Sequence, residues 1–275
     1  MRADAEVNRV EPIRPTLAVV PVSLATTSDL DDVVRCLVSL WSTTENVYAI
    51  VVDDASPDPG LVDQLEVAAA ELGYDVERLV APAGRAAAVN AGLAIAHQVG
   101  GDALVCDPNL DFRWEGWLDR MRERTDSQGR PAAVVGARLL YPNGVIAHAG
   151  MLFSQLRREF FNRFRFGPAD LPEALRPTRC PVTHSLQLIR HETLASIGLY
   201  DESLDLGYEG TDYCLRAFAA GLEVIYEPAA IAAHAGEMPH QPSAESEEAS
   251  LDTRRRFFAK HSPRGLGEWV PEVMA

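Results

Sequence analysis

Apolar runs and stretches with helical spacing alternate along the first hundred residues. The apolar runs are short enough for buried strands and cover residues 16–22, 48–52, 76–80 and 103–106. The stretches between them have apolar positions three and four residues apart and cover residues 30–41, 61–72 and 86–99. Strands that alternate with helices of this length predict β-α-β units, a mainly parallel central sheet and helices on both of its faces.

The second half of the chain has a less regular pattern. Helices are expected at residues 114–124, 191–197, 210–220 and 251–260, and strands at 132–140, 145–151, 182–189 and 224–226. Residues 155–179 mix Arg, Phe and Pro without periodicity and are expected to form an excursion. Residues 1–15 are expected to be a disordered arm and residues 236–250, rich in Glu, Ser and Pro, a mobile segment. We therefore expect one domain over residues 16–236, followed at 237–275 by a mobile segment and a helix.

Composition and charge narrow the class of protein. The 275 residues are 47% apolar, as in ordinary globular proteins, and the net charge of −15 argues against general binding to phosphate backbones. The cysteines lack Cys-x-x-Cys spacing, which predicts buried thiols in a reducing compartment; they are Cys36, Cys106, Cys180 and Cys214. No apolar run is long enough for a transmembrane segment, and the first residues lack the apolar region of a signal peptide. A cytoplasmic protein is therefore expected.

Polar residues follow two of the predicted strands where they end. Asp53 and Asp54 come directly after the second strand, and Asp107-Pro-Asn109 comes after the fourth. In open α/β sheets, ligands bind beyond the carboxyl ends of the strands, and a carboxylate there can hold a hard cation that in turn holds a diphosphate. The alternative is structural, because Asp-Pro-Asn is a common turn and an acid after a strand often caps the next helix.

Six blocks of the sequence, in order, resemble signatures of glycosyltransferase family 2, the inverting enzymes with the GT-A fold. They are Val-Val-Asp-Asp-Ala-Ser at 51–56, Gly-Arg-Ala-Ala-Ala-Val-Asn-Ala-Gly at 84–92, Asp-Pro-Asn at 107–109 with the following 114–118, Ile-Gly-Leu-Tyr-Asp-Glu at 197–202, Tyr-Glu-Gly-Thr-Asp-Tyr-Cys-Leu-Arg at 208–216, and His-Ala-Gly at 234–236. The third block resembles the Asn-Pro-Asp-Thr and Gly-Trp-Leu signature of the family's rhamnosyltransferase-like branch. The resemblance covers residues 16–236 and implies a Rossmann-like GT-A domain with a nucleotide-sugar-binding half, 16–112, and an acceptor half, 113–236.

The resemblance also implies a donor, which would be a UDP- or dTDP-sugar whose sugar passes to an acceptor hydroxyl. It assigns base and ribose to Pro21, Val22, Asp53 and Asp54. It places Asp107 at the diphosphate and Arg85 at the diphosphate or the base, and a guanidinium suits phosphate. The alternative for Arg85 is a solvated side chain.

A metal site at Asp107, Asn109 and His234 is a further implication of the resemblance. The family holds Mn²⁺ or Mg²⁺ with an Asp at the position of Asn109. An amide oxygen can ligate a hard cation but brings no charge, so weak or absent metal dependence is an open alternative. A histidine ligand such as His234 suits Mn²⁺ better than Mg²⁺. The alternative for His234 is an ordinary surface histidine.

The position of the family's catalytic base holds Gly210, which has no side chain. Glu209 is the nearest carboxylate and our hypothesis for a substitute base. Asp212 matches the other acid of the motif, to which the family gives a more structural role, and Asp205 is a third option. The departures at Asn109 and Gly210 keep a rival hypothesis open, a catalytically impaired GT-A-like module that binds a nucleotide or a protein partner.

The acceptor is not defined by the sequence, and a glycan, a lipid-linked molecule, a protein and a small molecule all stay open. Residues 157–166 alternate Arg with Phe, a pattern suited to an anionic or aromatic acceptor, a membrane surface or a partner subunit, including a second copy of the chain. Single-stranded nucleic acid would also suit it, although the net charge disfavours that partner. The alternative is an excursion whose Phe side chains pack on the sheet. The remaining histidines lack ligand spacing and are expected to be structural: His97, His148, His184, His191, His240 and His261.

Overall fold

The computed structural model describes residues 14–126, 130–154, 156, 159–205, 207–235, 244–261 and 272–273. Its N-terminal half alternates strands and helices in the predicted order. The strands are β1 (Thr16–Val22), β2 (Val47–Asp53), β3 (Asp75–Arg78) and β4 (Asp102–Cys106), and the helices are α1 (Thr27–Thr43), α2 (Pro59–Glu71) and α3 (Arg85–Gln98). The four strands pair in parallel in the order β4-β1-β2-β3, which confirms the β-α-β units.

The second half adds mixed strands and four helices. Its helices are α4 (Trp117–Thr125), α5 (His191–Ile197), α6 (Glu209–Ala219) and α7 (Ala244–Lys260), with short 3-10 turns at Pro172–Leu175 and Glu202–Leu204. Its strands are β5 (Leu110–Asp111), β6 (Ala132–Leu140), β7 (Ile146–His148), β8 (Met151–Ser154), β9 (Glu159–Asn162), β10 (Thr178–Arg179), β11 (Leu186–Ile189), β12 (Glu223–His234) and β13 (Glu272–Val273).

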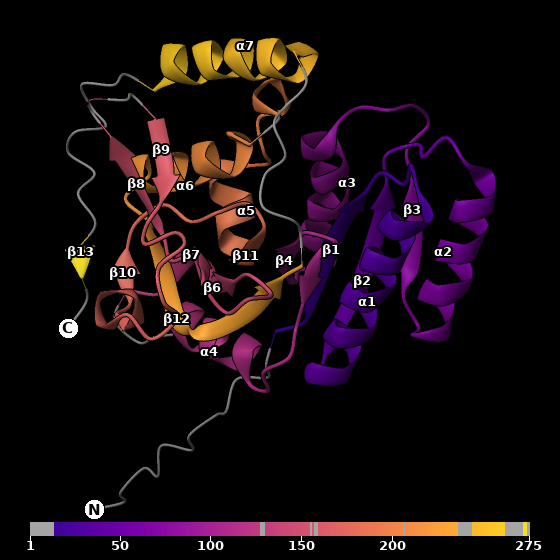
Figure 1. Cartoon of the computed structure of the whole chain (residues 1–275), viewed down its shortest axis with the longest axis horizontal. Coiled ribbons are helices and arrows are strands. Elements are labelled where there is room, and N and C mark those ends of the chain that lie inside the picture. The colour runs from indigo at the N-terminus through magenta and orange to yellow at the C-terminus, as the bar shows by residue number, and fades with distance from the viewer. Residues whose placement is uncertain are drawn as a thin grey trace, which may run out of the picture.

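One 11-stranded sheet joins the two halves, in the order β13-β10-β12-β6-β11-β4-β1-β2-β3, with β5 beside β12 and β7 beside β6. Strand β11 lies antiparallel between β4 and β6, so it connects the parallel N-terminal strands to the second half (Figure 1). The loop before β11 therefore reaches the carboxyl end of β4, where the sequence predicts a ligand site.

The helices cover both faces of the sheet and bury two separate apolar clusters. In β1, Ala18 and Val20 belong to the cluster formed with α1, α2 and α4, whereas Leu17 and Val19 belong to the cluster formed with α3, α5, α6 and α7. This alternation follows from the strand geometry, in which successive side chains point to opposite faces. The predicted architecture, an α/β central sheet that is parallel through its N-terminal half and covered on both faces, is confirmed.

Several predicted elements differ in their bounds. The predicted strand 145–151 divides into β7 and β8, and the predicted strand 182–189 begins only at Leu186. Strand β12 begins as predicted but continues to His234, with a register shift between Glu227 and Ile231 around Pro228. Helix α7 begins at Ala244, inside the stretch that was expected to be mobile, and it lies over the end of the second half (Figure 1). The rest of that stretch, residues 236–243, lies outside the described residues, as does most of the predicted arm, 1–13.

The Arg- and Phe-containing segment folds back onto the protein. Arg163 is buried, and Phe160 and Phe164 pack against the cluster under α6 and α7. Arg165 donates to the Tyr141 hydroxyl from Nε at 2.9 Å and Nη2 at 2.6 Å. Only Phe161 and Phe166 are exposed among the described phenylalanines of this segment. This arrangement supports the structural alternative for residues 159–166, while Arg157 and Arg158 lie outside the described residues.

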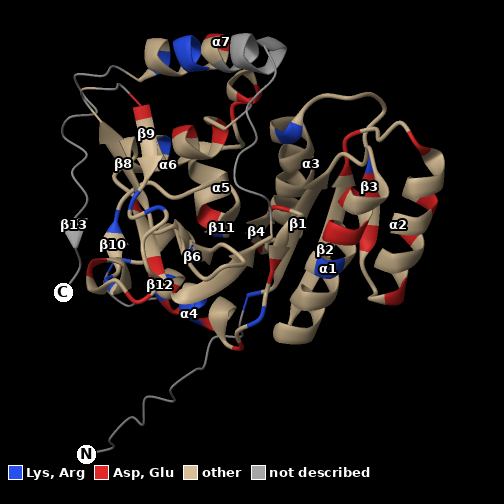
Figure 2. Cartoon of the chain, in the orientation of Figure 1, with Lys and Arg blue, Asp and Glu red and all other residues tan. Residues whose placement is uncertain are grey.

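The state of the cysteines and the distribution of charge agree with what the composition predicts. All four cysteines are free and buried, as predicted. Acidic positions are spread over both halves, and α2 carries acidic residues without a basic one (Figure 2).

Within the described part of the chain, no helix combines the length and the apolar character needed to cross a bilayer.

Candidate functional site

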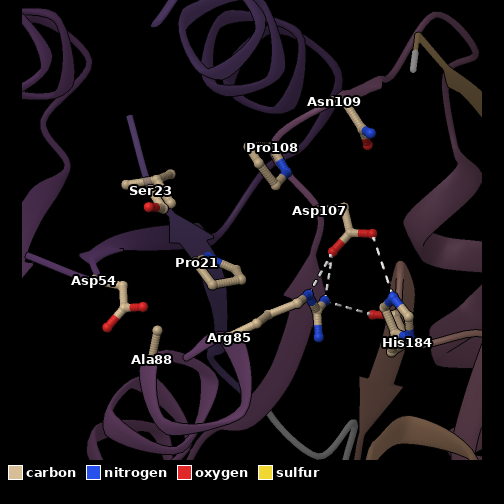
Figure 3. Close-up of a pocket in the computed structure, with 10 residues that line it drawn as sticks. Pro21, Ser23, Asp54, Arg85, Ala88, Asp107, Pro108, Asn109 and His184 are labelled. Atoms are coloured by element: carbon tan, nitrogen blue, oxygen red, sulfur yellow. Dashed lines mark hydrogen bonds and ion pairs between the residues drawn. The ribbon is translucent and has the colours of Figure 1, made fainter. Parts of the chain in front are cut away.

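A cavity of about 320 Å³ opens at the carboxyl ends of β1 and β4 (Figure 3). Its lining comes from both predicted strand ends, from the start of α3 and from the loop before β11: Pro21, Val22, Ser23, Asp54, Arg85, Ala88, Asp107, Pro108, Asn109 and His184. Five of the six residues predicted to hold a nucleotide therefore lie together. The sixth, Asp53, does not line the cavity.

Asp53 and Asp54 are neighbours in sequence but have different partners. Asp53 is fully buried, accepts from the Ser56 amide at 3.1 Å and pairs with Arg78 Nε at 3.1 Å, so it stabilises the turn after β2. Asp54 lines the cavity, and its two oxygens accept from the amides of Ala83 at 2.6 Å and Gly84 at 2.9 Å. Asp54 is thus placed where a ligand can meet it, whereas Asp53 is buried away from the cavity.

The start of α3 is fixed by contacts with the second half of the chain. The Ala86 amide donates to Asp205 Oδ1 at 3.1 Å, and a Cβ on Gly84, whose φ is +91°, would lie 2.3 Å from Asp205 Oδ2. One turn later, Asn90 donates to the Tyr200 carbonyl at 3.0 Å and accepts from the Tyr200 amide at 2.8 Å. Asp205, one of the candidate bases, therefore caps α3, and these contacts position Arg85.

Arg85 is the first residue of α3 and bridges two carboxylates. Its Nε lies 3.1 Å from Asp107 Oδ1, and its Nη1 lies 3.0 Å from Glu209 Oε1. Burial alone would raise the pKa of the Asp107 carboxyl, but the charge of Arg85 outweighs it and holds that pKa well below its usual range. A fixed cation thus stands at the cavity wall, where it could contact an anionic ligand.

Neither predicted catalytic acid reaches the cavity. Glu209 is fully buried at the start of α6, and its second oxygen, Oε2, accepts from the Gly207 amide at 2.8 Å. Asp212 is also fully buried and contacts Arg216 at 2.8 Å, His261 at 2.7 Å and Lys260 at 2.8 Å. Burial raises the pKa of Asp212, but these three contacts lower it by more, so the pKa falls to about 2. Asp212 therefore anchors the end of α7 to α6.

Asn109 and His234 are brought together by strand pairing. His234 pairs with Leu110 between β12 and β5, and the Ala235 amide donates to the Asn109 carbonyl at 2.7 Å. Asn109 Oδ1 and His234 Nδ1 are both buried without a hydrogen-bond partner. Burial lowers the pKa of His234, which keeps a nitrogen lone pair available, while the nearby charge of Asp107 acts in the opposite direction.

These two unpartnered atoms and the Asp107 carboxylate are donors that fit a divalent cation, with one charged ligand only. Among the residues that the structure describes, no group of three or more His, Cys, Asp or Glu side chains could hold a metal ion. Of the three candidate ligands, only Asp107 and His234 are of these residue types, because Asn109 offers an amide oxygen. The prediction of a weak site therefore stays open.

His184 is a residue of the cavity that the sequence did not reveal. It precedes β11, far in sequence from the other lining residues, and it carries no spacing motif. Its Nδ1 lies 3.5 Å from Glu209 Oε1, and its Nε2 lies 3.9 Å from Asp107 Oδ2. The Arg85 guanidinium also donates to its carbonyl at 3.2 Å (Figure 3).

A second cavity, of about 230 Å³, lies on the side of the second half. It is lined by Leu139, Tyr141, Ala147, His148, Asn162, Arg165, Thr183, Ser185 and His234. The two cavities are neighbours, since the Ser185 carbonyl of the second accepts from the amide of Asp107, which lines the first, at 2.8 Å. Asn162 and Arg165 of the Arg- and Phe-containing segment thus line a cavity beside the first one.

Comparison with known sequences gives one distant relative of undefined role. No protein-family model matches the sequence. An uncharacterized protein of Sinorhizobium fredii, y4gI, is 25% identical over 227 residues, which cover 77% of this chain and 23% of that protein. The chain therefore spans less than a quarter of the length of this curated relative.

Comparison with solved structures identifies the fold. GalNAc-T7 in complex with UDP, GalNAc and Mn²⁺ superposes with a TM-score of 0.67 at 16% identity, over 92% of this chain and 49% of that one. TarS of S. aureus, residues 1–349, superposes with a TM-score of 0.55 at 15% identity, over 91% of this chain and 74% of that one. The chain therefore has the GT-A glycosyltransferase fold that its motifs implied.

Proposed function

We propose that this chain is an inverting, family 2-type glycosyltransferase of the rhamnosyltransferase-like branch. It would transfer a hexosyl or related sugar from UDP or dTDP to an acceptor hydroxyl. The observation that carries the proposal is the cavity at the strand ends, which brings Asp54, Arg85 and Asp107 together. In α/β folds this edge of the sheet is where nucleotides bind. Asp54 would accept from the base or ribose, and Arg85 would contact the diphosphate.

A divalent ion, Mn²⁺ or Mg²⁺, belongs to this proposal. Asp107, Asn109 and His234 would hold it, and a bound ion would supply positive charge against the leaving diphosphate. Arg85 already places one positive charge beside Asp107, so the proposal includes only partial dependence on the ion. GalNAc-T7, which shares the fold, was solved with UDP and Mn²⁺, and this supports a divalent ion as part of the proposal.

The second cavity is our proposal for the acceptor side. It lies beside the first cavity, because Ser185 of its lining is bonded to Asp107 of the other, and its lining includes the polar side chains of Asn162 and Arg165. Such a lining suits a sugar ring or another polyhydroxylated group, carried by a glycan, a lipid, a protein or a small metabolite. The free thiols suit a reducing, cytoplasmic compartment, and a homo-oligomer remains part of the proposal.

The alternative function is a GT-A-like module that binds a nucleotide or a protein partner without turnover. Two observations favour it. Asn109 brings no charge to the metal position, and the predicted base Glu209 is fully buried and bonded to Arg85. The enzyme and a nucleotide-binding module both predict nucleotide binding at this cavity, so turnover separates those two, whereas a module for a protein partner predicts no nucleotide binding.

Calorimetric titration with UDP, dTDP and GDP, each with and without Mn²⁺, tests the proposal. We expect UDP or dTDP to bind, and Asp54→Asn to weaken binding at least about tenfold, which corresponds to about 1.4 kcal/mol. Asp63→Asn, at an exposed acid of α2, is the matched control and should leave binding unchanged. Absence of binding by all three nucleotides would contradict the proposed transfer and would favour a module that binds a protein partner. Binding without release of UDP or dTDP from any sugar donor would favour the module without turnover.

A further inference from the structure

We propose that His184 accepts the proton of the acceptor hydroxyl and that Glu209 positions its ring. This inference rests on the glycosyl transfer proposed above, because that reaction needs a proton acceptor at the cavity. General bases of this kind must come within about 3 Å of the proton donor, directly or through one water. His184 lines the cavity and belongs to the predicted acceptor half of the chain.

The two acids of the cavity have other roles in the proposed reaction. Asp54, held by two backbone amides, would bind the base or ribose, and Asp107 is paired with Arg85. Glu209 has an exposed fraction of 0%, whereas the side chain of His184 is 26% exposed. Among the described residues that line the cavity, His184 is therefore the remaining side chain with a basic lone pair free to take a proton.

The surroundings of the ring favour this role. Nδ1 lies 3.5 Å from Glu209 Oε1, a contact that favours the tautomer with the proton on Nδ1 and leaves the lone pair on Nε2. Nε2 lies on the side of the cavity wall formed by Asp107, whose Oδ2 is 3.9 Å away. Arg85 in turn holds Glu209 in place from Nη1 at 3.0 Å. Glu209 therefore acts through His184 as a positioning residue.

Gly210 provides the space that His184 needs. A Cβ built on Gly210 would lie 2.5 Å from His184 Cβ, 2.9 Å from its Cα and 3.2 Å from its backbone nitrogen. No side chain fits at position 210 while the loop before β11 keeps this conformation. The absence of a carboxylate at position 210 is thus explained by the presence of His184 against it, and it need not indicate lost activity.

The proposed step balances as a single displacement. The acceptor oxygen forms a bond to the anomeric carbon, and its proton passes to Nε2 of His184. The bond between the anomeric carbon and the phosphate oxygen breaks, and its electron pair leaves with the nucleoside diphosphate. Water in place of the acceptor gives donor hydrolysis by the same step, so the role of His184 can be measured before the acceptor is identified.

The test compares His184→Gln with the wild-type full chain. The probes are UDP-N-acetylgalactosamine, UDP-glucose and dTDP-rhamnose, and release of the nucleoside diphosphate is measured together with its binding. We expect His184→Gln to bind the nucleotide as the wild type does and to lose about 10²–10⁴-fold in turnover. Added imidazole should partly restore turnover in His184→Ala. Glu209→Gln should lower kcat while KM for the donor stays unchanged. His97→Gln, at an exposed histidine stacked on His191, is the matched control and should match the wild type.

Each other outcome has a definite meaning. If the wild type is active and His184→Gln keeps its turnover within about threefold, far less than the loss of a general base, this inference is overturned and the proposed function stands. Nucleotide binding that falls together with turnover in His184→Gln would assign a structural role and would also overturn it. A wild type that turns over none of the donors would overturn the proposed transfer, and this inference with it.

Discussion

Arg85 and Glu209 join the two halves of the chain by an ion pair at the centre of the site. Arg85 is the first residue of α3 and Glu209 the first of α6, and the two charged groups lie 3.0 Å apart. Arg85 also contacts Asp107, so one guanidinium links the start of α3, the end of β4 and the start of α6. The buried carboxylate of Glu209 therefore contributes to the stability of the fold as well as to the geometry of the site.

Replacement of Glu209 by Ala should destabilise the protein. It removes one partner from a buried ion pair and leaves the Gly207 amide without its acceptor, which costs about 3 kcal/mol. Urea denaturation followed by circular dichroism measures this loss. Glu66→Ala, at an exposed acid of α2, is the control and should change the free energy of unfolding by less than about 0.5 kcal/mol. Equal effects of the two substitutions would show that the pair contributes nothing to stability.

His148 should make stability depend on pH in a defined window. Its Nε2 accepts from the amides of Gly150 at 3.2 Å and Thr183 at 3.3 Å, so the ring is neutral in the fold. Burial lowers its pKa to about 4, although a hydrogen bond with Asn162 acts in the opposite direction.

An unfolded histidine takes up a proton near pH 6.5, whereas His148 in the fold does so only near pH 4. The unfolded state therefore binds more protons as the pH falls from about 6.5 to 4, and the protein loses about 3 kcal/mol of stability over that range. Urea denaturation at several pH values should show this slope in the wild type and a flatter one in His148→Gln. The same slope in both proteins would contradict the assignment.

Arg85 should matter for ligand affinity through the shape of its guanidinium as well as its charge. A Lys at this position keeps the charge but cannot contact Asp107 and Glu209 with separate nitrogens. We expect Arg85→Lys to weaken UDP or dTDP binding about tenfold, or about 1.4 kcal/mol, in calorimetric titration. Arg120→Lys changes an exposed arginine of α4 that pairs with Glu123, and it should leave affinity unchanged. Unchanged affinity in Arg85→Lys would place the diphosphate elsewhere.

The fold was predictable from the sequence because local patterns determine it. The spacing of apolar residues identified β1 to β4 and the helices between them, and parallel pairing then aligned the strand ends that carry Asp54 and Asp107. The difference between Asp53 and Asp54 was not predictable, because it depends on Arg78 and on the amides of the loop before α3.

The role of His184 could not be predicted for a similar reason. It enters the site through the antiparallel pairing of β11 with β4, and no periodicity in the sequence encodes that pairing. The burial of Glu209 likewise depends on Arg85, a residue in the other half of the chain. The sequence did show that Gly210 stands where the family resemblance implies a carboxylate. The structural reason, the packing of His184 against Gly210, needs the spatial neighbour to be known.

Gly210→Ala tests that neighbour directly. A Gly to Ala change inside a helix normally gains up to about 1 kcal/mol. At Gly210 the new Cβ would lie 2.9 Å from the backbone Cα of His184, and overpacking of this kind costs about 1–3 kcal/mol. Gly60→Ala is the matched control, since Gly60 is also the second residue of its helix, α2, and its Cβ would meet only Asp58 Oδ1 at 3.2 Å. We expect urea denaturation to show a loss of stability for Gly210→Ala and little change for Gly60→Ala.

Gly210→Asp tests the catalytic role of position 210, because it introduces the carboxylate that the resemblance to glycosyltransferase family 2 implies there. If the chain had simply lost its base, this substitution should raise turnover. The structure leads to the opposite expectation, since the same Cβ would displace His184 before the carboxylate could act. Release of nucleoside diphosphate from a sugar donor should therefore fall in Gly210→Asp, as in Gly210→Ala. A gain in Gly210→Asp that Gly210→Ala does not share would show that position 210, and not His184, is where this fold places its base.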